Sequence, residues 1–107
     1  MNIEPQARPV AMLLIAVQDS DLDLFKSAFS SRMQKSIASE GAGEWRVGMR
    51  EYKKLFAKEF GDYRIDDFEF SFSGDARKGR ANVSLRGREL PGLAVVCEGS
   101  EWKLDEK

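Results

Sequence analysis

The chain has 107 residues, of which 42% are apolar and 33% charged, and 17 basic against 18 acidic side chains leave a net charge of −1. This size and mixture are typical of one globular domain and exclude a disordered tail or an integral membrane protein. The near-zero charge argues against a general attraction to nucleic acid or to an anionic membrane. With no histidine and a single cysteine, the sequence excludes an intrachain disulfide, histidine-based catalysis and almost all zinc sites.

The apolar run at residues 10–17 is the one stretch that resembles a targeting segment. It is too short to span a bilayer, and its flanks favour a core helix over a signal peptide, because Glu4, Pro5 and Pro9 precede it and no A-x-A site follows. Two locations stay open: the cell envelope or the exterior if an export signal has been removed, and the cytoplasm otherwise.

The first half of the chain has the periodicity of amphipathic helices. It predicts helices at about residues 6–18, 20–36 and 44–60. The first prediction depends on the i, i+3, i+4, i+7 spacing of Val10, Leu13, Leu14 and Val17. Ser20 and Asp23 have the spacing of a capping box for the second helix, and Gly61 suits the end of the third.

After Gly61 the apolar side chains alternate with the period of β-strands. The alternation and the intervening turns predict strands at about residues 63–73, 79–87, 92–98 and 101–105. Within the first strand the phase slips at Asp66 and Asp67, which predicts a β-bulge or a sharp bend there. Helices followed by strands predict an α+β fold, with three N-terminal helices packed on a curved, mainly antiparallel four-strand sheet.

Three stretches of the sequence resemble a known superfamily. Residues 11–29 read as helix, break and helix, residues 80–85 as a hairpin strand, and residues 93–105 end in Trp102-Lys103-Leu104-Asp105. They resemble the cone-shaped superfamily of nuclear transport factor two and ketosteroid isomerase. They are most similar to short bacterial members of uncharacterised function, many of them lipoproteins or secreted accessory domains. The resemblance implies a single cystatin-like cone over residues 1–107, whose curved sheet and helices enclose a pocket.

Aromatic and apolar side chains of the third helix and the strands are candidates to line that pocket. The predicted lining is Trp45, Met49, Tyr52, Phe56, Phe68, Phe70 and Trp102. A possible polar part of the pocket or its rim consists of Tyr63, Asp66 and Asp67. Each aromatic residue also fits a plain core role, and aspartates are common at solvated bends. No position matches the superfamily's catalytic pattern, so we predict no catalytic residue.

A basic cluster is the second candidate site. It comprises Arg77, Lys78, Arg80, Arg86 and Arg88 and suits an anion or a partner protein. No aromatic side chains are interleaved with it, so the stacking platform of a nucleic-acid site is missing. Glu69 and Asp75 are expected to be its cross-strand partners, which favours a solvated, partly paired sheet face.

The sequence therefore predicts a non-catalytic binding or accessory domain that holds a small apolar ligand or a protein segment between the third helix and the sheet. One alternative is a protein-interaction or homodimerisation module that uses the outer sheet face. Another is a small isomerase- or dehydratase-like enzyme with a tyrosine–aspartate pocket. No Gly-rich phosphate loop or calcium loop is present, and we expect no metal, no cofactor, no nucleic acid and no membrane span.

Overall fold

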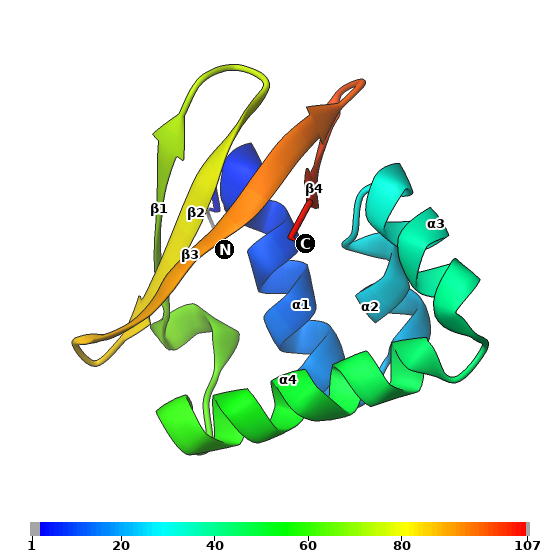
Figure 1. The fold of residues 1–107 in the computed structure, drawn as a ribbon. Helices are drawn as coiled ribbons and strands as arrows, with labels where there is room; N and C mark the ends of the chain where they lie inside the picture. The colour runs from blue at the N-terminus through cyan, green and yellow to red at the C-terminus, as the bar shows by residue number, and fades with distance from the viewer. Residues whose placement is uncertain (1–2, 107) are drawn as a thin grey trace.

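The computed structural model describes residues 3–106, which form an α+β fold and confirm the predicted fold class (Figure 1). The helices are α1 (Arg8–Asp19), α2 (Leu22–Ser27), α3 (Ser31–Glu40) and α4 (Glu44–Phe60). Two short 3-10 turns, η1 (Pro5–Ala7) and η2 (Ile65–Asp67), precede α1 and the sheet. The strands are β1 (Glu69–Gly74), β2 (Lys78–Leu85), β3 (Arg88–Glu98) and β4 (Glu101–Leu104).

Within the described residues, the strands form a single antiparallel sheet in the order β1-β2-β3-β4. Figure 1 shows α1 behind this sheet, α4 across one end of the molecule, and α2 and α3 beside β4. β2 and β3 are therefore the inner strands, and the helices lie on one side of the sheet and at its end.

Helix α1 is the centre of the hydrophobic core. Its buried side chains are Pro9, Val10, Ala11, Leu13, Leu14, Ala16 and Val17. A helix that is apolar on nearly every side is stable only where other elements cover it all round. The inner sheet face contributes Ala81, Val83 and Leu85 to this core, and the other helices contribute Phe25 and Phe56.

The predicted helix at residues 20–36 is wrong in one respect, because the structure breaks it into α2 and α3. Ser30 caps α3 by accepting a hydrogen bond from the Met33 amide at 3.2 Å. The connecting segment pairs with β4: the Ser30 amide donates to the Leu104 carbonyl, and the Leu104 amide donates to the Ala28 carbonyl, both at 2.7 Å. Phe29 and Met33 continue the helical spacing across the break, so the pattern alone conceals it.

The predicted strand at residues 63–73 begins only at Glu69. The phase slip at Asp66 and Asp67 is a 3-10 turn, η2, so the sharp bend predicted there is confirmed and the alternative, a bulge, is wrong. Tyr63 lies before this turn and donates a hydrogen bond from its hydroxyl to the Leu14 carbonyl at 2.7 Å. A helical turn shifts the alternation just as a bulge does, because both add residues without advancing the strand.

The connection predicted between residues 87 and 92 belongs to β3 instead. A two-residue turn at Arg86 and Gly87, with φ of 50° and 82°, joins β2 directly to β3. The sheet does contain a bulge, but it lies in β3, because Ala81 pairs with Leu93 whereas Val83 pairs with Leu90. Proline cannot donate to a ladder and is tolerated at bulges, which fits the Pro-Gly sequence at positions 91–92.

Candidate binding groove

A groove of about 610 Å³ lies between α3, α4 and the bulged part of β3. It is lined by Met33, Tyr52, Leu55, Phe56, Arg80, Leu90, Gly92, Leu93 and Glu106. Its volume is within the range of roughly 300–1,000 Å³ that small-molecule pockets occupy. We call this cavity the α4–β3 groove.

The apolar wall of the α4–β3 groove comes from two elements. On α4, Tyr52, Leu55 and Phe56 have the i, i+3, i+4 spacing that places them on one side of the helix. Leu55 is 40% exposed, although Phe56 beside it is only 2% exposed. On β3, Leu90 and Leu93 flank the bulge and face the helix across the groove.

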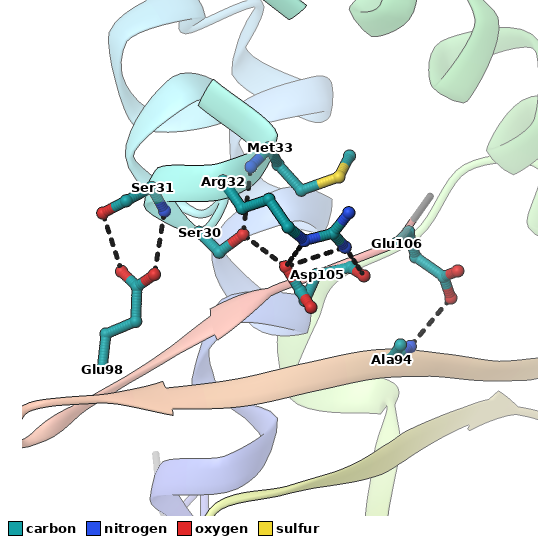
Figure 2. A network of polar contacts seen from close by, with 8 residues as sticks. All are labelled: Ser30, Ser31, Arg32, Met33, Ala94, Glu98, Asp105 and Glu106. Atoms are coloured by element: carbon teal, nitrogen blue, oxygen red, sulfur yellow. Dashed lines mark hydrogen bonds and ion pairs between the residues drawn. The ribbon is translucent and has the colours of Figure 1, made fainter. Parts of the chain in front are cut away.

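The polar end of the groove is formed by Arg80 and Glu106. The Arg80 guanidinium donates a hydrogen bond from Nη1 to the Gly92 carbonyl at 2.7 Å and lies 3.9 Å from the Glu106 carboxylate. The same carboxylate oxygen of Glu106 accepts a hydrogen bond from the Ala94 amide at 2.8 Å (Figure 2). The groove thus combines an apolar wall with a cation and an anion at one end.

Tyr52 connects the apolar wall to this polar end. Burial raises the pKa of the Tyr52 hydroxyl above its usual value, and the negative charge of Glu106 raises it further. The hydroxyl therefore stays protonated at neutral pH and can donate a hydrogen bond inside the groove.

A second polar network holds the chain segment that carries Glu106 (Figure 2). The Ser30 hydroxyl donates to the Asp105 carboxylate at 2.6 Å, and Arg32 donates from Nε to the same oxygen at 3.1 Å. Glu98 accepts hydrogen bonds from the Ser31 amide at 2.9 Å and from its hydroxyl at 3.2 Å. We call these contacts the α3 clasp, because two carboxylates tie the start of α3 to the end of the sheet.

The pKa of Asp105 reflects this network. Partial burial acts to raise the pKa, but the hydrogen bonds from Ser30 and Arg32 and the charge of Arg32 outweigh it and lower the pKa below its usual value. The carboxylate is thus ionised at neutral pH and binds the start of α3, where negative charge also suits the helix dipole.

The structure does not bring the predicted pocket residues together in one cavity. Tyr52 and Phe56 line the α4–β3 groove. Phe68 and Phe70 line a separate hollow of about 610 Å³ together with Asp66. The remaining members, Trp45, Met49 and Trp102, pack in or against the core.

The predicted tyrosine–aspartate pocket is not assembled either. Tyr63 is buried, and burial, with the charge of Asp19 adding to it, raises the pKa of its hydroxyl to about 12. Asp66 and Asp67 are exposed on η2, and neither lines the groove that contains Tyr52. These groups share no site, so the structure offers no arrangement for a joint role in acid–base chemistry.

The basic cluster is divided between the two ends of β2. At one end, the Asp75 carboxylate accepts hydrogen bonds from the backbone amides of Arg77 and Lys78, which lower its pKa. At the other end, Arg86 reaches the Asp62 carbonyl at 3.4 Å and Arg88 reaches Glu59 at 3.5 Å. Of the five residues in the basic cluster, only Arg80 lines the α4–β3 groove.

The prediction that Glu69 is a cross-strand partner of the basic cluster is wrong, because Glu69 lies opposite Ser84 rather than an arginine. Ser73, not an acidic residue, lies opposite Arg80. Register decides which side chains meet across a sheet, and η2 delays the start of β1 and so changes the register that the sequence suggested.

Several groove residues were missed by sequence reasoning. They are Met33, Leu55 as a lining residue, Leu90, Gly92, Leu93 and Glu106. Leu55 had a usable signal, because it lies three residues from Tyr52 on the same helix side. For Leu90 and Leu93 the signal was the Pro-Gly pair between them, which marks a bulge. Glu106 had no such sequence signal, because its contacts depend on tertiary structure.

Among residues 3–106, no helix is both long and apolar enough to cross a membrane. In the same residues, no group of three or more histidine, cysteine, aspartate or glutamate side chains is placed to hold a metal ion. No family model, curated protein or solved structure matches this chain.

Proposed function

We propose that this chain is a binding domain and that the α4–β3 groove takes a small ligand with an apolar body and a polar end. The observation that carries the proposal is the combination of an apolar wall, including the exposed Leu55, with Arg80, Glu106 and the Tyr52 hydroxyl at one end. Pockets that bind small molecules have this composition: a mostly apolar lining with a few polar groups that fix orientation.

The location of exposed apolar side chains supports this choice of surface. Among the described residues, the exposed large hydrophobic side chains are Val47 and Leu55, both on α4. The outward side of β2 instead carries the polar Asn82 and Ser84, and Arg80 reaches from this side to the polar end of the groove. A ligand in the groove would remove apolar surface from water at about 25 cal/mol per Å². The resemblance to the cone-shaped superfamily also supports a pocket between helices and sheet.

The proposal is tested with N-phenyl-1-naphthylamine, a neutral probe whose fluorescence rises in apolar surroundings. We expect saturable enhancement with the wild-type chain, and loss of most of it in Leu55→Glu, because a carboxylate at the groove wall makes burial of an apolar probe costly. The matched control is Val47→Glu, which places the same charge at a similarly exposed position of α4 outside the groove.

Circular dichroism and thermal unfolding of both variants show whether each is folded. Binding that survives in Val47→Glu and is lost in Leu55→Glu supports the groove. Equal binding in the two variants, or no saturable binding by the wild type, overturns the proposal.

A further inference from the structure

We infer that the polar end of the α4–β3 groove is a carboxylate-binding subsite, which Glu106 of the chain itself occupies and which the carboxylate of an amphiphilic ligand takes over by displacing Glu106. This inference depends on the proposed function and names the class of ligand: an apolar chain or ring that carries one carboxylate. The Glu106 carboxylate thereby competes with the ligand carboxylate for the same subsite.

The subsite already holds a carboxylate. Glu106 accepts a hydrogen bond from the Ala94 amide at 2.8 Å, and the Arg80 guanidinium lies 3.9 Å away. β4 ends at Leu104, which pairs with Val95, so the Ala94 amide lies just beyond the end of the strand pairing. A backbone donor beside a guanidinium is suited to an anion.

Arg80 is placed to receive an anion. Its Nη1 is anchored on the Gly92 carbonyl at 2.7 Å, yet the side chain remains 63% exposed. A guanidinium has five N–H donors, so this anchor leaves others for an incoming anion. The cation is therefore fixed in position and still accessible to an incoming carboxylate.

Glu106 is held weakly enough to be displaced. It follows β4, and its described polar contacts are one amide hydrogen bond and one long ion pair, in which Glu106 is partly exposed and Arg80 mostly exposed. Exposed ion pairs contribute little to stability. The α3 clasp holds the preceding residue, Asp105, so Glu106 can leave the subsite while β4 stays paired.

The apolar wall determines the rest of the ligand. Tyr52, Phe56 and Leu93 line the same cavity as the Arg80–Glu106 pair, so a ligand carboxylate at Arg80 has its apolar body along these side chains. Tyr52 and Glu106 line the same cavity, and the Glu106 charge helps to raise the pKa of the Tyr52 hydroxyl, so this protonated hydroxyl would donate to a ligand carboxylate that takes the place of Glu106.

The test compares decanoate with 1-decanol, which has the same chain length and no charge, as competitors of the neutral naphthylamine probe. In Glu106→Ala, we expect decanoate to bind about tenfold more tightly than in the wild type, because the internal competitor is removed. Decanol affinity should change by less than about twofold, since it does not need the subsite. In Arg80→Gln, decanoate should bind at least about tenfold more weakly, with decanol again unchanged.

Two control variants match these changes in charge outside the groove. Glu101→Ala removes a carboxylate from the start of β4, and Arg88→Gln removes a guanidinium at the other end of β2. Both should leave decanoate affinity near the wild-type value. An equal gain in Glu101→Ala would mean that net charge alone is responsible and would overturn the inference.

The outcomes separate this inference from the proposed function. If the neutral probe and decanol bind in a Leu55-dependent way but decanoate gains nothing from Glu106→Ala, the carboxylate subsite is refuted and the groove remains. If the neutral probe does not bind at all, both are refuted. Unfolding curves of each variant identify any that has lost its fold, and decanol binding serves as an internal measure of an intact groove.

Discussion

Two glycines of the sheet occupy positions where a methyl group has no room. A Cβ on Gly79 would lie 2.3 Å from the Ser73 carbonyl oxygen and 2.7 Å from the Phe72 ring. A Cβ on Gly92 would lie 2.5 Å from the Asn82 amide oxygen and 3.1 Å from the Arg80 Cβ. At Gly92, the missing side chain lets Arg80 run alongside β3 to the groove.

Gly79→Ala should therefore destabilise the protein by about 1–3 kcal/mol, because the added methyl group meets backbone and an aromatic ring that cannot both move away. The matched control is Gly43→Ala, where a Cβ meets nothing within 4 Å and φ is −86°. Its free energy of unfolding should stay within about 1 kcal/mol of the wild-type value. Urea unfolding of the two variants checks this, and equal losses would show that crowding at Gly79 is not the cause.

The sequence alone does not predict contacts of this kind between individual residues. The sequence pattern places both glycines at the starts of predicted strands, but nothing in a linear pattern shows that Phe72 lies over one and Arg80 beside the other. Tyr52 and Phe56 could be predicted, since the stripe of α4 identifies its buried side. Glu106 could not, because its partners Arg80 and Ala94 become neighbours only after the sheet has formed.

At the scale of helices and strands, boundaries that depend on the local sequence pattern can be predicted, whereas boundaries that depend on tertiary contacts cannot. Helix α4 spans Glu44–Phe60, the range that its apolar stripe and Gly61 predict. The division of α2 from α3 depends instead on hydrogen bonds between Ser30 and residues of the sheet and its end. Where strong tertiary bonds compete with a continuous helical pattern, the tertiary bonds decide the boundary.

The α3 clasp makes stability depend on pH through Asp105. Its folded-state pKa lies below its ordinary value of about 3.9, so its ionised form stabilises the fold above that pH. As the pH falls below about 4 and through the folded-state pKa, the carboxylate is protonated and this contribution is lost. Asp105→Asn should lower the free energy of unfolding by about 1–2 kcal/mol at pH 7. In acid, the difference in free energy of unfolding between this variant and the wild type should become smaller.

Chemical denaturation at pH 7 and at pH 3 measures this difference. Asp67→Asn, on the exposed turn η2, is the matched control and should follow the wild type at both pH values. A difference between Asp105→Asn and the wild type that stays constant or grows in acid would contradict the assignment to Asp105.

For the whole molecule, the dominant feature is a single mostly buried helix, α1, which packs against α2, α4 and β4. Leu13 and Leu14 of α1 are fully buried, whereas Leu55 on α4 is 40% exposed on the groove wall. Leucine thus belongs to the core in α1 and to a candidate binding surface in α4. Stability should therefore depend on the α1 positions, and ligand binding on Leu55.

Leu14→Ala should cost about 2–5 kcal/mol of stability, because it removes a fully buried side chain and leaves a cavity in the core. Leu55→Ala should change stability by less than about 1 kcal/mol and weaken binding of the naphthylamine probe. Thermal unfolding and probe titration of the two variants measure both effects. Comparable destabilisation by the two would show that Leu55 is a core residue rather than part of a binding surface.

The bonds between the α2–α3 connection and the last strand also have a consequence for biosynthesis. Ser30 and Asp105 are 75 residues apart in the sequence. At about 5–20 residues per second of translation, Ser30 would wait on the order of 4–15 s before Asp105 is made. During the first part of that interval α1 has been synthesised and the strands that cover it have not, so the nascent chain exposes its most apolar helix. Folding that depends on such distant contacts is slow, and this domain should need protection from aggregation until its last strand is complete.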